Sequence, residues 1–266
     1  MPEGSTVASG GVFPKFGRSA GRLVFRGLRL RLLDLLLPVR CLDCGVAMER
    51  PADSIFFCPA CRCELAPEAV PHCLRCGATR EATAATCVWC RGHRLQFDHV
   101  IHLGLYREKL RGVVLRMKHS MTESLSASMG RLLLQARGEA LCQWHADLVV
   151  PVPMHWQRRF ARGISSPDVL ASCLAKGLGI PLCRALARKR NTKPQNELHA
   201  RQRFRNVYGA FRLCSGYDLG GARVLLVDDV LTTGATASAA ARVLKRAGAA
   251  AVAIAVAARA EGPDSR

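Results

Sequence analysis

Hydrophobic and polar positions follow the most regular pattern in the last third of the chain. The apolar runs within Arg223–Val227 and Ala251–Val256 are typical of strands that are buried on both faces. Ala237–Ala247, which lies between them, has the composition of a helix and is followed by Gly248 as a stop signal. A strand, a helix and a second strand at this spacing form a right-handed crossover unit, which predicts a parallel sheet.

The middle of the chain continues this α/β pattern. Apolar residues alternate from Phe97 to Tyr106, which predicts a strand, and Arg107–Lys118 has helical spacing. Asp147–Val152 contains a short apolar run bounded by prolines, which predicts a buried strand, and a helix is expected from about Pro167 to Leu178. We therefore predict one α/β domain over residues 97–260, with a parallel sheet flanked by helices.

The N-terminal region lacks this pattern. Residues 1–21 contain Gly, Ser and Pro without periodicity and are predicted to be disordered. In residues 22–38, Leu, Val and Phe recur at helical spacing among arginines until Pro38 stops the pattern, which predicts an amphipathic helix. This helix could dock on the rest of the protein, contact a partner or lie on an anionic surface.

The charge of the chain favours a polyanionic partner. Its 266 residues have a formal net charge of +19, and 49% of them are hydrophobic, which is enough to bury a core. Twelve Arg and Lys residues lie between Arg158 and Arg205, against Asp168 and Glu197. The last part of this basic region, Thr192–Arg205, is expected to be a mobile loop. A general preference for arginine over lysine also contributes to the charge.

The apolar stretches Leu32–Leu37 and Ala249–Ala258 are too short to cross a bilayer, and the first also contains Asp34. No signal peptide is recognisable, so we expect a soluble, cytoplasmic protein. The thirteen cysteines are then expected to be reduced thiols or metal ligands rather than disulfides.

Four Cys-x-x-Cys pairs follow one another within residues 39–93. Two thiolates spaced in this way can bind one metal ion, and two such pairs complete a tetrahedral shell. Eight ligands therefore predict two structural zinc ions in a zinc-ribbon module, which is too small to fold without them. The predicted ligands are Cys41, Cys44, Cys58, Cys61, Cys73, Cys76, Cys87 and Cys90.

Several details of this module remain open at the level of sequence. Consecutive pairs could share an ion, which is the simpler arrangement, or alternate pairs could do so in a cross-brace. Cys63 could replace Cys61, and His72 or His93 could replace a thiolate. An iron–sulfur cluster is an alternative for the same thiols. A thioredoxin-like redox pair is disfavoured because no strand leads into a helix at these positions.

The segment Val224–Thr236, with the sequence VLLVDDVLTTGAT, combines two acids with a loop of small residues. Asp228 and Asp229 follow a buried strand, at the edge of a parallel sheet where ligands bind. The loop leads into a helix N-terminus that favours phosphate, and it consists of Thr232, Thr233, Gly234, Ala235 and Thr236. Because carboxylates repel phosphate, the acids need hydroxyl groups or a metal as partners. A ribose 5-phosphate meets both demands. A Walker loop and a dinucleotide fingerprint are excluded, because their residue patterns are missing.

The same segment resembles the signature with which type I phosphoribosyltransferases bind phosphoribosyl diphosphate (PRPP). From about Leu32 to Ala258, the chain is similar to the ComF family of bacterial competence-related proteins. Besides the cysteine pairs, the resemblance rests on Lys118 after a helix, VVPVP at Val149–Pro153, Arg162-Gly163, Thr192, Gln195 and Leu198 in TKPQNEL, Arg203, Asn206-Val207 and Gly209-Ala210-Phe211. It implies a type I phosphoribosyltransferase-like sheet flanked by helices, with a small N-terminal cysteine-rich zinc module.

The resemblance also implies roles for individual residues. Asp228 and Asp229 would be catalytic and hold the ribose hydroxyls, directly or through Mg²⁺. The TTGAT loop would bind the 5′-phosphate of PRPP. The turn of Val152, Pro153 and Met154 would lie near the pyrophosphate. A basic loop over the site would include Arg188, Lys189, Arg190 and Lys193.

One departure from the family concerns the second substrate. Family members continue Arg-Gly with Phe-Asn-Gln, whereas this chain has Ile164-Ser165-Ser166, so an amide pair expected near the substrate is missing. Three functions are therefore considered. The chain could be a phosphoribosyltransferase with an unidentified acceptor, or a protein that handles single-stranded DNA together with other DNA-uptake proteins. It could also be a PRPP-sensing regulator without turnover. We predict the phosphoribosyltransferase function first, with DNA binding as the alternative that the basic charge, the zinc module and the family resemblance support.

Overall fold

The computed structural model describes residues 38–80, 87–91, 95–119, 123–154, 164–189 and 200–261, without the side chains of 119 and 200–203. The predicted disordered segment lies outside these ranges, as does the predicted N-terminal helix except for Pro38. Arg190, Lys193 and His93 also lie outside them. The chain from Arg40 onward forms one compact unit.

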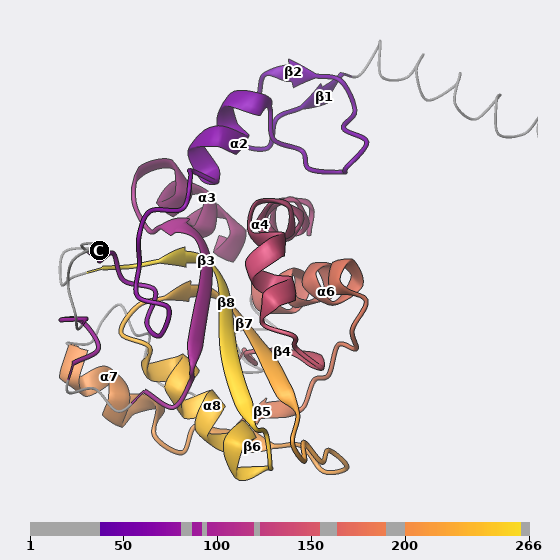
Figure 1. Cartoon of the computed structure of the whole chain (residues 1–266). Helices are drawn as coiled ribbons and strands as arrows, with labels where there is room; N and C mark the ends of the chain where they lie inside the picture. The colour runs from indigo at the N-terminus through magenta and orange to yellow at the C-terminus, as the bar shows by residue number, and fades with distance from the viewer. Residues whose placement is uncertain are drawn as a thin grey trace, which may run out of the picture. The chain divides into compact units, whose positions relative to one another are not determined.

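Four strands form the central sheet in the order β3-β8-β7-β4, and all of them are parallel, as predicted (Figure 1). The strands are β3 (His99–Leu105), β4 (Leu148–Pro151), β7 (Arg223–Leu231) and β8 (Ala251–Arg259). Helix α8 (Ala235–Arg246) connects β7 to β8 and confirms the predicted crossover unit. Helices α3 (Glu108–His119) and α6 (Ser166–Leu178) also lie where the sequence predicts them.

Other elements differ from the sequence-based prediction. Helix α4 (Ser124–Gln143) was not predicted, nor were the small antiparallel pair β5 (Leu186–Arg188) and β6 (Phe211–Leu213). The prediction of a loop over Thr192–Arg205 is wrong for its last residues, because helix α7 (Ala200–Val207) begins there. Phe204 and Val207 of α7 pack into a hydrophobic core, and this burial stabilises a helix whose composition is otherwise polar.

The strand predicted to end at Val227 is longer in the structure. Strand β7 continues to Leu231, because β8 is longer than expected and pairs with β7 beyond Val227. Val230 pairs with Ala258, and Leu231 pairs with Arg259. The two acids therefore lie on a rigid strand rather than in a loop.

Alternate residues of the sheet face two separate hydrophobic cores. Leu225 and Val227 of β7 face the core shared with α3, α4 and α6, whereas Val224 and Leu226 face the core shared with α8. Figure 1 shows these two groups of helices on opposite sides of the sheet. Both faces are covered, which explains why the central strands are continuous apolar runs.

The cysteine-rich region is divided between the same two cores. Its first part contains β1 (Val39–Arg40), β2 (Ala47–Met48) and α2 (Pro59–Leu65), and its buried residues join the core of α3, α4 and α6. Cys73 and Cys76 in its second part belong instead to the core on the α8 side. The two halves of the region are therefore attached to different faces of the sheet.

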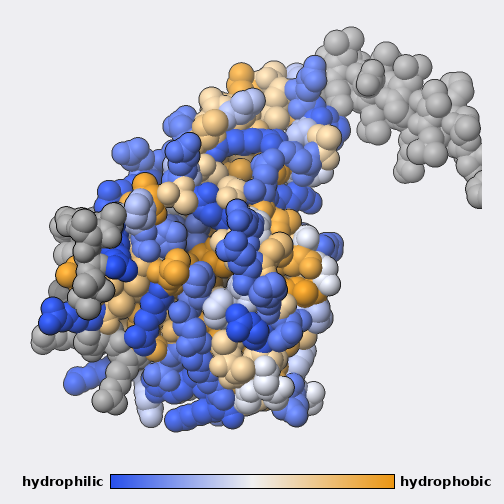
Figure 2. Space-filling model, in the orientation of Figure 1, coloured by the Kyte–Doolittle hydropathy of each residue, from blue (hydrophilic) through white to orange (hydrophobic). Residues whose placement is uncertain are grey.

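The surface agrees with the strongly basic composition. Figure 2 shows a face on which hydrophilic residues predominate and hydrophobic residues occur in small groups. Among the helices that the structure describes, none has the length and apolarity needed to cross a membrane.

Candidate functional site

The centre of the candidate site is the pair Asp228 and Asp229 near the carboxyl end of β7. Both side chains are half-buried. The Asp229 N–H donates a 2.8 Å hydrogen bond to Oδ1 of Asp228, and Nζ of Lys118 lies 3.6 Å from Oδ2 of Asp229. The strand and the end of α3 thus bring two carboxylates and one ammonium group together.

The acidity of Asp228 is strongly perturbed. Burial raises its pKa to about 7, and the negative charge of Asp229 acts in the same direction. The backbone N–H of Asp229 and the charges of Lys118 and Arg188 oppose this shift. The pKa of Lys118 is raised because Asp229 stabilises its ammonium form. A metal ion or hydroxyl groups of a ligand would further stabilise the Asp228 carboxylate, so the site is suited to such a ligand.

This perturbation predicts that Asp228→Asn stabilises the unliganded protein at high pH. The folded-state pKa lies above the ordinary value of 3.8, so ionising Asp228 costs stability as the pH rises from about 4 to about 7. The amide removes that cost and keeps an oxygen for the Asp229 N–H. We expect a gain on the order of 2 kcal/mol in the free energy of unfolding at pH 8 and little gain at pH 4.5, measured by urea unfolding. An equal gain at both pH values would contradict this electrostatic explanation.

The predicted phosphate loop follows directly after β7. Gly234 has a φ of 77°, a left-handed conformation that favours glycine, and a Cβ there would lie 3.2 Å from Cζ of Phe97. The Thr233 hydroxyl accepts a 3.4 Å hydrogen bond from the N–H of Ala235, where α8 begins. Ala235 and Thr236 therefore belong to the first turn of the helix, so the positive end of the helix dipole follows the two acids along the chain.

The predicted pyrophosphate turn directly follows the neighbouring strand β4. Because β4 and β7 are parallel, their carboxyl ends meet at one edge, and Val152 donates a 2.8 Å hydrogen bond to the Val227 carbonyl. Pro153 and Met154 follow and are half-buried. Arg188 ends strand β5 rather than lying in a loop, and its charge acts on Asp228.

The departure at Ile164-Ser165-Ser166 has a structural role. Ser165 and Ser166 are 6% and 2% exposed at the start of α6. The Ser166 hydroxyl donates a 3.2 Å hydrogen bond to the carbonyl of Met117, the residue before Lys118. The small Ser166 side chain therefore contacts the part of α3 that carries the lysine.

The eight predicted thiols form two groups of four. Cys41, Cys44, Cys58 and Cys61 form the first cluster, and Cys73, Cys76, Cys87 and Cys90 form the second; within each, all sulfur atoms lie within 4.8 Å of one another. This confirms that consecutive pairs come together. The exposed Cys63 is not part of either group.

The spacing of the sulfur atoms fits tetrahedral zinc. Zn–S bonds of about 2.3 Å place neighbouring sulfurs about 3.8 Å apart. The Cys44–Cys58, Cys76–Cys87 and Cys73–Cys90 Sγ distances are 3.7, 3.6 and 3.9 Å. Each cluster could therefore hold one structural zinc ion.

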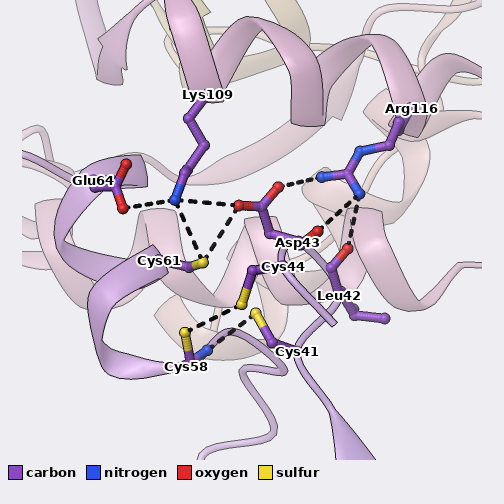
Figure 3. Close-up of polar contacts among 9 residues, drawn as sticks. All are labelled: Cys41, Leu42, Asp43, Cys44, Cys58, Cys61, Glu64, Lys109 and Arg116. Atoms are coloured by element: carbon purple, nitrogen blue, oxygen red, sulfur yellow. Dashed lines mark hydrogen bonds and ion pairs between the residues drawn. The ribbon is translucent and has the colours of Figure 1, made fainter. Parts of the chain in front are cut away.

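The first cluster is attached to α3 by charged side chains (Figure 3). Nζ of Lys109 lies 3.6 Å from Sγ of Cys61, 2.6 Å from Oε1 of Glu64 and 3.5 Å from Oδ2 of Asp43. Arg116 binds the Asp43 carboxylate and donates a 3.1 Å hydrogen bond to the Leu42 carbonyl. Because four thiolates around Zn²⁺ leave a double negative charge, the ammonium of Lys109 would partly neutralise the site.

Residues 168–265 match the family described as the phosphoribosyl transferase domain. With the parallel sheet and the acids at the end of β7, this match defines the class of protein: a type I phosphoribosyltransferase-like α/β fold with a cysteine-rich module that could bind zinc.

The relatives narrow the class to a family. The chain is 29% identical over 214 residues to competence protein F of Haemophilus influenzae, covering 79% of this chain and 92% of that protein. It is 33% identical over 188 residues to the DNA utilization protein YhgH of Salmonella typhimurium, covering 69% and 82%. A solved structure, the glutamine PRPP amidotransferase of B. subtilis, matches with 25% identity and a TM-score of 0.32, covering 49% of this chain and 26% of that one. The chain belongs to the ComF family.

Two residues near the site were not assigned a role from the sequence. Lys118 was noted only as a feature of the family resemblance, and its pairing with Asp229 depends on a contact between distant segments. Arg259 was not noted, although a charged residue at the end of the apolar strand β8 was a usable signal. It is 6% exposed and lies beside the phosphate loop.

Proposed function

We propose that this protein binds PRPP with Mg²⁺ at the carboxyl edge of β4 and β7, and transfers the phosphoribosyl group to an acceptor. The observation that carries the proposal is the carboxylate pair of Asp228 and Asp229, held beside Lys118 and next to the N-terminus of α8. The helix terminus favours the 5′-phosphate, and the acids suit the ribose hydroxyls or a cation.

The transfer would exchange one bond at the anomeric carbon for another. A nucleophilic atom of the acceptor forms a bond to this carbon while the bond to the pyrophosphate oxygen breaks. Pyrophosphate leaves with the bonding electrons, and the acceptor loses its proton to solvent. Positive charge develops on the ribose in between, so the nearby Asp228 and Asp229 would stabilise the transition state electrostatically.

A magnesium ion fits the oxygen donors that this edge provides. The carboxylates of Asp228 and Asp229 are hard ligands that suit Mg²⁺ together with ligand oxygens and water. Bound Mg²⁺ would supply charge neutralisation for the departing pyrophosphate. Lys118 would restrain Asp229 and balance the negative charge of the pair before any ligand arrives.

The test is calorimetric titration of the protein with PRPP in the presence of Mg²⁺. We expect saturable binding that requires the cation. Pyrophosphate release is then measured with purine and pyrimidine bases offered as acceptors. No heat of binding with properly folded, zinc-loaded protein would overturn the assignment of the site, whereas binding without release for any base would favour a PRPP sensor.

A second candidate function is the binding of single-stranded DNA. It is favoured by the relatives named competence protein F and DNA utilization protein, and by exposed apolar side chains within the Cys-x-x-Cys pairs of the second cluster. Leu74, Val88 and Trp89 are 61%, 76% and 42% exposed, and Arg75 and Arg91 next to them are exposed as well. An exposed Trp among arginines can stack on a base while the cations contact phosphates.

Fluorescence anisotropy of a dye-labelled single-stranded oligonucleotide tests the DNA function. Trp89→Ala is expected to weaken binding, and affinity is expected to fall steeply as salt is added. If the protein binds all polyanions equally well, and Trp89→Ala binds DNA as tightly as the wild type, the interaction is only general charge attraction.

A further inference from the structure

Arg259, the last residue of β8, contacts both the phosphate loop and the second cluster. Its Nε donates a 2.7 Å hydrogen bond to the carbonyl of Cys76. Its Nη1 donates to the carbonyls of Leu231 and Thr232, at 3.2 and 2.7 Å, and also to that of Ala260. One buried guanidinium therefore joins a metal-ligand segment to the residue at which the phosphate loop begins.

The far end of the phosphate loop packs against residues that follow the cysteine-rich region along the chain. A Cβ on Gly234 would lie 3.2 Å from Phe97 and 3.4 Å from Leu95, so both side chains pack directly against the loop backbone. The N–H of Gln96 donates a 3.0 Å hydrogen bond to the hydroxyl of Ser238 in the first turns of α8. Leu95, Gln96 and Phe97 follow the last ligands of the second cluster along the chain. One end of the loop is thus joined to the second cluster through Arg259, and the other end packs against Leu95 and Phe97.

The backbone around the ligands Cys73 and Cys76 of the second cluster is itself closely packed. The Gly77 N–H donates a 2.7 Å hydrogen bond to the carbonyl of Cys73, and a Cβ on Gly77 would lie 2.7 Å from Val100. The Val100 N–H donates a 2.8 Å hydrogen bond to the carbonyl of Leu74. The backbone between the two ligands is thereby fixed against β3. A change in the position of Cys76 would consequently be passed to Arg259.

The first cluster has no comparable contact among the described residues. Its charged side chains bind α3 through Lys109 and Arg116, and its buried residues belong to the core on the other face of the sheet. Among the described residues, only the second cluster is therefore linked to the phosphate loop by a side chain that contacts both.

We propose that metal in the second cluster sets the affinity of the phosphate loop for a sugar phosphate, and that Arg259 is the positioning residue that couples them. This inference rests on the proposed function. With the metal bound, the Cys76 carbonyl and the loop carbonyls are held at the distances that Arg259 spans. The loop N–H groups are then arranged before the ligand arrives. By thermodynamic linkage, the ligand must increase the affinity of the second cluster for its metal by the same factor.

The test compares Arg259→Gln with Arg223→Gln in the full-length, zinc-loaded protein. Arg223 is a matched control, because its Nε donates to the carbonyls of Trp144 and His145 at 3.0 and 3.2 Å, at the opposite end of β7. Ribose 5-phosphate is the ligand, since it contains the group that the loop would bind and needs no Mg²⁺. We expect its dissociation constant to rise about 10-fold in Arg259→Gln and to stay unchanged in Arg223→Gln.

Zinc release to a coloured chelator supplies a second measurement that does not depend on catalysis. In the wild-type protein and in Arg223→Gln, saturating ribose 5-phosphate is expected to slow the release of one of two zinc ions. In Arg259→Gln this protection should be lost. If Arg259→Gln does not fold, Arg259→Lys replaces it, because one ammonium group cannot span both segments and is expected to lose most of the protection.

The outcomes separate this inference from the proposed function. If wild-type protein binds ribose 5-phosphate and Arg259→Gln binds it equally well, the coupling is wrong and the site assignment stands. If the ligand protects both zinc ions alike, or neither, the coupling is also wrong. If the wild-type protein binds neither ribose 5-phosphate nor PRPP, the proposed function fails and the inference fails with it.

Discussion

The double substitution Asp228→Asn and Asp229→Asn is expected to abolish PRPP binding. The two amides keep the size of the carboxylates but lose the charge that would bind Mg²⁺ and strengthen hydrogen bonds to the ribose hydroxyls. Lys118, whose partner is Asp229, would also be left without its carboxylate in a half-buried place. We expect the dissociation constant for PRPP with Mg²⁺ to rise by about 100-fold or more, because two charge-assisted interactions are lost.

This experiment needs a control for general effects on charge and folding. Asp218→Asn is suitable, because Asp218 is exposed and accepts a hydrogen bond only from the nearby Gly220 N–H among the contacts of the described residues. It should leave PRPP affinity unchanged. Both proteins should retain two zinc ions, since the clusters share no ligand with the acids. Unchanged PRPP affinity in the double variant, with intact zinc content, would show that PRPP does not bind at the end of β7.

Some features of the structure could be predicted because their signals are local. The buried strands β7 and β8 and the helix between them each have their own pattern of apolar residues. The cysteine pairs likewise carry their ligand spacing within a few residues, and their order along the chain favoured pairing of consecutive pairs. The loop around Gly234 was recognisable because a left-handed residue before a helix calls for glycine.

Other features depend on contacts between distant segments. Helix α7 is polar in sequence and forms because Phe204 and Val207 find a core that other elements build. The pairing of Lys118 with Asp229 requires the end of α3 to meet β7, which no local pattern indicates. Arg259 is similar, since its partners Cys76 and Thr232 lie far apart along the chain. Such residues are identified only when the packing of the elements is known.

Because the cysteine-rich region is divided between two cores, loss of metal from the first cluster is expected to have a different effect from loss of metal from the second. The first cluster is continuous with the core formed by α3, α4 and α6, and contacts it through the buried side chains of Ile55 and Phe57. The N–H of Phe56 also lies 3.3 Å from the Ser128 hydroxyl on α4, and Arg131 donates a 3.0 Å hydrogen bond to the Ser54 carbonyl. Metal in the first cluster is therefore expected to act mainly on stability.

The substitution of Cys58 and Cys61 by serine should therefore lower stability strongly. Both residues are buried members of the first cluster, and their substitution would remove two of the four thiolates that could hold an ion. We expect zinc content to fall from two ions to one. The free energy of unfolding should fall by about 3 kcal/mol or more, since structural zinc contributes folding energy directly. Metal analysis and urea unfolding measure the two effects.

Cys63→Ser provides the matched control for this prediction. Cys63 lies on the same helix, α2, but is exposed and outside the four-sulfur group, so its substitution should change neither zinc content nor stability. Loss of zinc in Cys63→Ser would contradict the ligand assignment. Retention of two zinc ions after the combined Cys58→Ser and Cys61→Ser substitution would contradict the first site altogether. Loss of one ion without loss of stability would mean that the contacts of Lys109 and Arg116 with this segment hold it in place without the metal.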